Sequence, residues 1–217
     1  MIRVLIVDDE ALMRAGIRLI LENAEDIEVV AEAGDGREAV AACRAREIDV
    51  ALLDIQMPAV DGIAAAEDIA RLSPRTYVVM LTAFGEEALV TRALRAGASG
   101  FILKDTGPAD LIRAVRLAAK GEPVLAPRIT RQLLERQVRS GRNTEAALRR
   151  TEELTPAERD VLRLLGTGLS NAEIADQLYL SVGTVKAHIS RILTRTGCAN
   201  RVQAAVLAHD AGLLTDR

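Results

Sequence analysis

Acidic residues stand at the ends of two apolar segments of this chain. Residues 2–7 run directly into Asp8 and Asp9, and residues 50–53 run into Asp54. If both segments are buried strands that end at one edge of a sheet, the three carboxylates share a crevice, where their charges repel one another. A hard divalent cation that prefers oxygen ligands would hold them together. The pattern therefore predicts a Mg²⁺ site formed by Asp8, Asp9 and Asp54.

Two further apolar segments end in polar residues of another kind, Thr82 and Lys104. A lysine and a bound Mg²⁺ offset the charge on phosphoryl oxygens, and a hydroxyl can donate a hydrogen bond to one of them. Asp54 ends the third, central segment and is the best candidate for accepting a phosphoryl group. The main-chain carbonyl of Gln56 could add a ligand to the ion. These residue types predict a site that holds a phosphoryl group.

Residues 1–120 alternate between short apolar runs and helical patterns, which is typical of βαβ units around a parallel sheet. The fold predicted is an α/β, flavodoxin-like, doubly wound sheet of five parallel strands, in which ligands bind at the carboxyl ends of the strands. Strands are expected near residues 2–7, 28–33, 50–54, 77–82 and 100–103. Helices are expected near residues 11–22, 36–46, 62–72, 86–96 and 108–120.

The pattern lapses in residues 121–150, which we interpret as a linker. It contains a possible short helix at 128–139 and a polar, flexible tether from Arg139. Residues 151–217 show no strand pattern and predict an all-α domain of four helices. The four helices are expected near 156–166, 171–178, 182–195 and 201–210.

Composition narrows the possible partners. The net charge of −3 is uneven: residues 1–120 hold 20 acidic and 14 basic residues, whereas residues 177–209 hold four basic residues and no acidic one. The two cysteines are too isolated for a disulfide framework or a zinc site. No apolar run approaches the roughly 18 residues that cross a bilayer, and the start of the chain turns acidic too early for a signal peptide. A cytoplasmic protein without a membrane partner is expected.

The landmarks of the first 120 residues resemble the receiver domain of bacterial response regulators. The resemblance implies that Asp54 takes a phosphoryl group from a sensor histidine kinase and that Thr82 then moves toward the phosphate. It also implies that the aromatic residue before the lysine, here Phe101, swings inward. Tyr is frequent at that position, so Phe101 keeps the packing role without a hydroxyl. The motifs that carry the resemblance are Asp8-Asp9, Asp54 with Met57-Pro58 and Asp61-Gly62, Thr82-Ala83, and Lys104-Asp105.

Residues 154–206 resemble the LuxR-type helix-turn-helix, with Leu154-Thr155-Pro156, Gly168-Leu169-Ser170-Asn171 and Thr184-Val185-Lys186 among the matching segments. In that geometry the second helix, which starts near residue 182, enters the major groove. The resemblance implies three groups of DNA contacts. Base edges are faced by Lys186, Ala187 and Ser190, the helix start offers Ser181 and Thr184 to phosphate, and further phosphates are bound by Arg191, Arg195 and Arg201.

The two halves together resemble a NarL/FixJ-type response regulator. This implies a phosphorylation-activated, DNA-binding transcriptional regulator of a two-component system, and not an enzyme. Phosphorylation would promote a homodimer and binding to promoter DNA. An alternative is a receiver that acts mainly as a protein-interaction module, with weak or vestigial DNA binding. The basic face between Lys186 and Arg201 argues against that alternative.

Enzymatic interpretations of the first half are weaker. Residues 34–39 (Gly-Asp-Gly-Arg-Glu-Ala) follow a strand, with Asp54 twenty positions after Gly34, and so mimic a dinucleotide-binding fingerprint. Asp54, however, belongs to the acidic cluster. A haloacid-dehalogenase-type phosphatase has a second aspartate two residues after its nucleophile, where this chain has Gln56. Taken alone, Asp35 and Asp61 are interpreted as helix caps.

Overall fold

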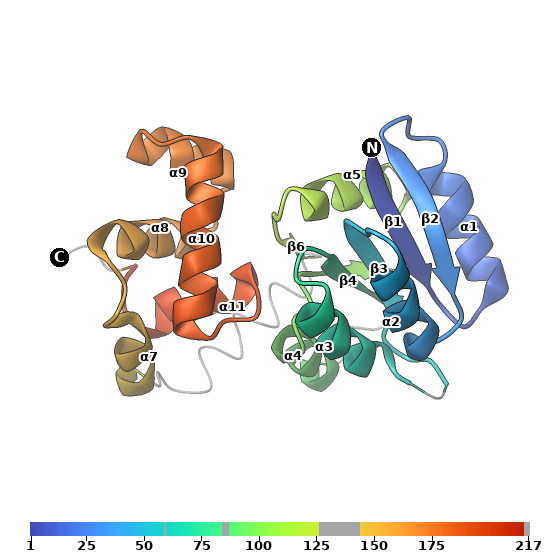
Figure 1. Ribbon diagram of the computed structural model, residues 1–217, viewed down its shortest axis with the longest axis horizontal. Coiled ribbons are helices and arrows are strands. Elements are labelled where there is room, and N and C mark those ends of the chain that lie inside the picture. Colours follow the sequence, from blue (N-terminus) through green and yellow to red (C-terminus); the bar gives the residue numbers. More distant parts are fainter. Residues whose placement is uncertain (59, 84–86, 126–143, 215–217) are drawn as a thin grey trace. The chain divides into compact units, whose positions relative to one another are not determined.

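The computed structural model describes residues 1–58, 60–83, 87–125 and 144–214. The chain divides into two compact units, residues 1–133 and 134–217, each with its own hydrophobic core (Figure 1). Within the described part of the chain, none of the helices combines the length and the apolar character needed to span a membrane.

The first unit is built on a parallel sheet with the strand order β2-β1-β3-β4-β5-β6. All five predicted strands are present, with ends that differ from the prediction by at most one residue. A two-residue strand, β6, extends the sheet beyond β5. The strands are β1 (Ile2–Val7), β2 (Ile27–Ala33), β3 (Val50–Asp54), β4 (Tyr77–Thr82), β5 (Gly100–Leu103) and β6 (Val124–Leu125).

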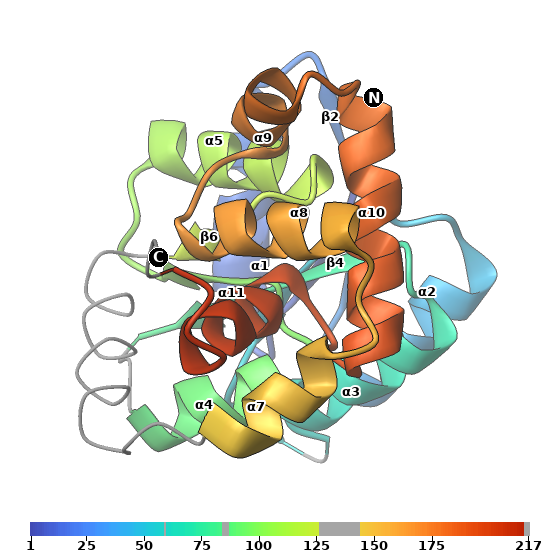
Figure 2. The same cartoon turned by 90° about the vertical axis from the view of Figure 1, so that its left-hand side faces the viewer.

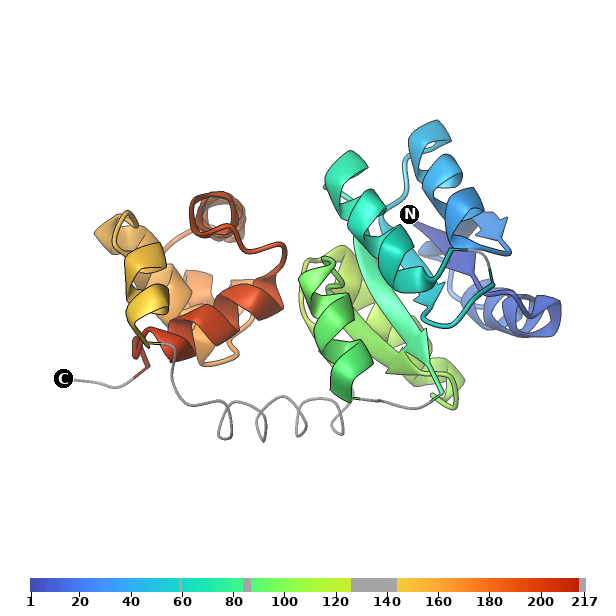
Figure 3. The same ribbon diagram turned by 90° about the horizontal axis from the view of Figure 1, so that it is seen from below.

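Helices cover both faces of this sheet (Figures 1 and 3). Helices α1 and α5 pack side by side on one face of the sheet. On the other face, α3 packs against both α2 and α4. Because both faces are covered, β3 is buried along its whole length. The predicted doubly wound fold is therefore confirmed. The helices are α1 (Ala11–Leu21), α2 (Gly36–Ala45), α3 (Gly62–Leu72), α4 (Glu87–Arg95) and α5 (Pro108–Ala119).

Two acidic residues of this unit serve as helix caps, as predicted. Asp35 Oδ1 accepts a hydrogen bond from Glu38 N at 2.9 Å at the start of α2, and Asp61 Oδ1 accepts one from Ala64 N at 2.8 Å at the start of α3. Gly36 is tightly packed, since a Cβ there would lie 2.9 Å from the Val60 carbonyl oxygen. Capping and close packing therefore account for the glycine pattern that mimics a dinucleotide-binding fingerprint.

The described part of the second unit is helical and contains no strand (Figure 2). Helices α8 and α9 each begin with a capping box, formed by Thr155 with Glu158 and by Ser170 with Glu173. The four predicted helices are confirmed, and a fifth, α7, precedes them. The helices are α7 (Thr144–Thr151), α8 (Pro156–Gly166), α9 (Asn171–Leu178), α10 (Val182–Thr196) and α11 (Arg201–Asp210).

Both ends of the expected linker, residues 121–150, contain regular structure. Strand β6 pairs with β5, and Ala147 of α7 is buried in the core of the second unit. Arg150 donates hydrogen bonds to the Thr196 carbonyl from Nε at 2.9 Å and from Nη2 at 2.6 Å. Neither element is long or periodic enough to predict from its own residues. The helix expected at 128–139 and the tether expected from residue 139 lie outside the described residues.

Gly62 sets the distance between α3 and the end of β3. Its N–H donates to the Ile55 carbonyl at 3.1 Å, and a Cβ at this position would lie 1.9 Å from the main-chain oxygen of Asp54. No side chain larger than hydrogen fits there without moving the backbone that carries Asp54.

We therefore expect Gly62→Ala to lower the free energy of unfolding by roughly 1–3 kcal/mol, the usual cost of overpacking a filled site. Urea unfolding followed by circular dichroism measures it. Gly16→Ala, in the middle of α1 with no atom within 4 Å of the added Cβ, is the matched control and should gain up to about 1 kcal/mol from helix propensity. A Gly62→Ala variant as stable as wild type would contradict this packing argument.

Candidate functional site

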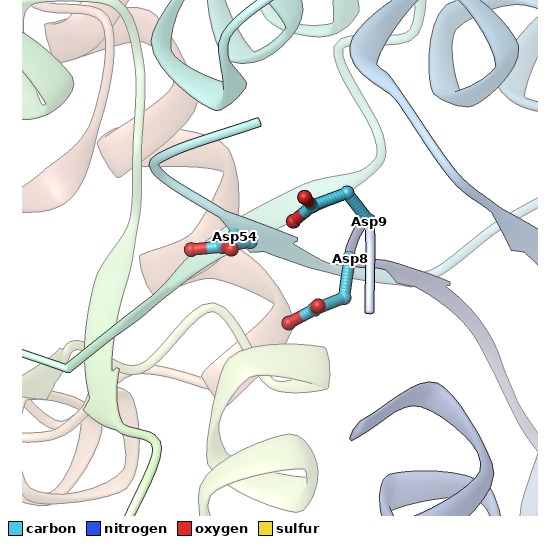
Figure 4. A group of neighbouring side chains, drawn as sticks. All are labelled: Asp8, Asp9 and Asp54. Atoms are coloured by element: carbon cyan, nitrogen blue, oxygen red, sulfur yellow. The ribbon is translucent and has the colours of Figure 1, made fainter. Parts of the chain in front are cut away.

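Three carboxylates meet at the carboxyl ends of β1 and β3. One oxygen from each of Asp8, Asp9 and Asp54 lies within 4.8 Å of the other two (Figure 4). Asp8 is fully buried, Asp54 is 5% exposed, and Asp9 is open to solvent. The parallel pairing of β1 with β3 brings these strand ends to one edge. The structure thus brings together the three residues predicted to hold Mg²⁺.

Lys104 reaches the same cluster from the end of β5. Its Nζ lies 2.8 Å from Asp8 Oδ2 and 2.8 Å from Asp54 Oδ2. The main-chain N–H of Lys104 donates to the Thr82 carbonyl at 2.9 Å. Burial lowers the pKa of Lys104, but its contacts with the carboxylates of Asp54 and Asp8 outweigh burial and raise that pKa, so Lys104 carries a positive charge. Burial raises the pKa of Asp54 despite the opposing hydrogen bond from Lys104.

The donor set fits a hard divalent cation. Asp8 Oδ1 accepts a hydrogen bond from Glu10 N at 2.9 Å, but Asp8 Oδ2 is buried and accepts none of suitable geometry from the described residues, although Lys104 Nζ is near. Three carboxylates face a single ammonium, so negative charge is left over. An oxygen-lined crevice with excess negative charge is what Mg²⁺ requires. The Gln56 N–H donates to Asp54 Oδ1 at 3.3 Å, and a ligand role for the Gln56 carbonyl stays a prediction.

The two residues expected to respond to a phosphoryl group lie on the neighbouring strands. Thr82 is the last residue of β4, pairs alongside Leu103, and is 4% exposed. Phe101 of β5 is 1% exposed, so its ring lies in the interior. Thr82 ends its strand at the same edge of the sheet as Asp54. Phe101 lies three positions before Lys104 and contributes a buried aromatic ring, not a polar group.

Two residues that shape this site, Gly62 and Arg14, carry no local sign of that role in the sequence. Gly62 belongs to the quoted motif, yet nothing local shows that its Cα approaches the main chain of Asp54. Arg14 of α1 donates from Nη1 to the Asp8 carbonyl at 2.6 Å, and its Nε lies 3.4 Å from Glu32 Oε2. Both contacts depend on how helices pack against the sheet, which residue spacing alone does not reveal.

The second unit contains a helix-turn-helix formed by α9 and α10. Tyr179 ends α9 in the left-handed region (φ 55°), and Leu180 N then donates to the Ala175 carbonyl at 2.8 Å to close the turn. On α10, Val185, Ile189 and Ile192 are buried and Leu193 is half-buried. The opposite face is open to solvent and carries Lys186, Ala187, Ser190, Arg191 and Arg195.

The start of α10 is capped by one of the predicted phosphate contacts. Ser181 Oγ accepts a hydrogen bond from Thr184 N at 3.0 Å and lies 2.8 Å from Thr184 Oγ1. Ser181 is exposed and Thr184 is half-buried. The first turn of a helix presents main-chain N–H groups and a positive dipole end, which suit a phosphate.

Arg201 does not lie on this face, which corrects the expectation that it binds phosphate. It is 8% exposed, its Nη1 donates to Asn171 Oδ1 at 2.7 Å, and its Nη2 donates to the Leu169 carbonyl. The guanidinium therefore ties α11 to the start of α9, and binding a phosphate would break these buried hydrogen bonds. A basic residue in a basic stretch gives no local sign that it points inward.

Comparisons with known proteins match each of the two units to a family. Residues 4–116 match the family described as response regulator receiver domain, and residues 152–208 match the family described as bacterial regulatory proteins, luxR family. The uncharacterized transcriptional regulatory protein YxjL of Bacillus subtilis is 39% identical over 98% of this chain and 97% of its own length.

A second relative is the nitrate/nitrite response regulator protein NarL of Escherichia coli K12. It is 35% identical over 95% of this chain and 94% of its own length. A structure described as two RcsB dimers bound to two parallel DNAs is 26% identical, covers 99% of both chains and has a TM-score of 0.56. From these matches, the chain belongs to the two-component response regulators that join a receiver domain to a LuxR-type DNA-binding domain, and it is a phosphorylation-dependent DNA-binding regulator.

Proposed function

We propose that Asp54 is the phosphoryl acceptor of this regulator and that a sensor histidine kinase is the donor. The observation that carries the proposal is the convergence of Asp8, Asp9 and Asp54 within 4.8 Å, with Lys104 Nζ 2.8 Å from two of them. In the transfer, an Asp54 carboxylate oxygen forms the new P–O bond while the P–N bond to the kinase histidine breaks. Asp8, Asp9 and Asp54 would hold Mg²⁺, and the main-chain carbonyl of Gln56 would be a further ligand.

Each remaining residue has a role that its position supports. Bound Mg²⁺ would offset negative charge on the phosphoryl oxygens. Lys104 already contacts Asp54 and needs only a small shift to pair with a phosphoryl oxygen. The Thr82 hydroxyl would donate to another, and movement at the end of β4 would change the packing around Phe101 on β5. A phosphoryl group thereby biases the receiver between two packed states.

We further propose that the output is promoter binding by a homodimer formed on phosphorylation. A dimer places two α10 helices at two half-sites, as helix-turn-helix proteins require. On α10, Lys186, Ala187 and Ser190 would face base edges. Phosphates would be bound by Ser181, Thr184, Arg191 and Arg195. All of these side chains except the half-buried Thr184 are exposed, which supports the assignment.

Phosphorylation at a single site is the first expected outcome. Wild-type chain incubated with acetyl phosphate and Mg²⁺ should gain one phosphoryl mass by intact mass spectrometry, and Asp54→Asn should gain none, because it lacks the nucleophilic carboxylate. Omitting Mg²⁺ should abolish the gain. An equal gain in Asp54→Asn would refute the assignment.

Mg²⁺ binding is expected to depend on Asp9. Titration calorimetry of Asp9→Asn should give at least about a tenfold weaker Mg²⁺ affinity than wild type, since one anionic ligand is lost. The matched control is Asp35→Asn, which removes an acid after β2 that caps α2 and lies outside the cluster. Similar affinities for the two variants would remove Asp9 from the proposed site.

DNA recognition is expected to depend on Lys186. At a duplex selected from a random pool by the full-length chain, Lys186→Ala should cost roughly 1–3 kcal/mol and relax preference at one position of each half-site if the ammonium bonds a base edge. If it contacts only phosphate, binding should weaken evenly across sequences and the salt slope should fall by about 1. A folded variant with unchanged affinity and salt dependence would show that α10 is not the reading helix.

A further inference from the structure

A buried carboxylate lies beneath the exposed face of α10. Glu158, in the first turn of α8, is 2% exposed, which is rare for a glutamate. Its Oε2 accepts hydrogen bonds from Thr155 N and from Thr155 Oγ1, both at 3.0 Å. The main-chain hydrogen bond from Thr155, helped by the charges of Arg195 and Arg191, holds the pKa of Glu158 below its usual value. The capping box thus fixes an ionised carboxylate in one place.

Both charged partners of this carboxylate come from α10. Arg195 Nη1 lies 3.2 Å from Glu158 Oε2 and also donates to the Glu153 carbonyl at 3.0 Å, while Arg191 Nε lies 3.7 Å from Glu158 Oε1. The two arginine side chains nevertheless stay 43% and 55% exposed. A guanidinium has five N–H donors. The contacts of Arg195 use Nη1, and those of Arg191 use Nε and Nη2, which lies 3.3 Å from His188 Nδ1. Each guanidinium thus has inward contacts while part of it stays open to solvent.

We propose that Glu158 is a positioning residue for DNA binding, whose carboxylate holds the guanidiniums of Arg191 and Arg195 in place for the phosphate backbone. The proposal rests on the proposed function, in which α10 meets DNA. An anchored side chain loses less conformational freedom when it binds than a free one does. The negative charge of Glu158 also offsets one of the two positive charges, which by itself would weaken DNA binding. Any favourable contribution of Glu158 to binding must therefore come from orienting the two guanidiniums.

The chain contains a second capping box that separates this role from helix capping. Glu173 caps α9 with the same geometry: its Oε2 accepts from Ser170 N at 2.7 Å, and its N–H donates to Ser170 Oγ at 3.2 Å. Glu173 is exposed, and hydrogen bonds from Ser170, with no arginine among the causes, lower its pKa. A residue that merely caps should behave like Glu173.

The test compares Glu158→Gln with Glu173→Gln in the full-length chain. Glutamine keeps the acceptor oxygen and the volume but loses the charge. Binding is measured to a short mixed-sequence duplex at about 0.15 M salt, where long-range attraction is partly screened. Glu158→Gln should bind about 5-fold more weakly than wild type, and Glu173→Gln should bind no more weakly. In an Arg191→Ala, Arg195→Ala background, Glu158→Gln should no longer weaken binding.

The sign of the effect makes the test decisive. Removing a negative charge near DNA would by itself tighten binding, so weaker binding by a folded Glu158→Gln variant points to lost positioning. Thermal melts by circular dichroism establish that each variant is folded. Unchanged or tighter binding, or the same loss in the double-arginine background, overturns the positioning role while leaving the proposed function intact. If the double-arginine variant binds like wild type, the placement of α10 on DNA is overturned as well.

Discussion

Repulsion among three carboxylates is the constraint on which the receiver unit depends. Two unit charges about 4 Å apart repel by about 1 kcal/mol in water and by several times more near a protein interior, and here one carboxylate oxygen from each of three acids lies within 4.8 Å of the others. Lys104 touches two of them and offsets part of that repulsion. The proposed Mg²⁺ would offset the charge that remains and would in turn attract a phosphoryl group.

The fold holds this unfavourable arrangement because each participant belongs to a buried strand end. Parallel pairing of β1, β3, β4 and β5 fixes the edge, and Gly62 lets α3 approach the main chain of Asp54. The DNA-binding unit also uses a buried acid, but there Glu158 is fully partnered by a capping threonine and two arginines. The acidic cluster of the first unit keeps negative charge that a cation could offset, whereas the charge of Glu158 is already offset by two arginines.

Local patterns predicted most of this structure. Strand ends carrying Asp8, Asp54, Thr82 and Lys104 follow from apolar runs and topology rules, and the core face of α10 follows from its helical period. Strand β6 was not predictable because two residues give no period. Helix α7 has few apolar residues and is ordered by packing against its own domain. Arg201 points inward, where its guanidinium donates a hydrogen bond to Asn171. The two residues are 30 positions apart in the sequence, so residue spacing does not reveal this contact.

In the proposed mechanism, the state of the acidic site controls DNA binding by the other unit. The most direct test is the affinity of the full-length chain for one selected duplex, measured with and without prior phosphorylation in the presence of Mg²⁺. We expect phosphorylation to tighten binding by about 5-fold or more, the lower end of typical coupling between sites. An affinity that stays the same after complete phosphorylation would contradict it.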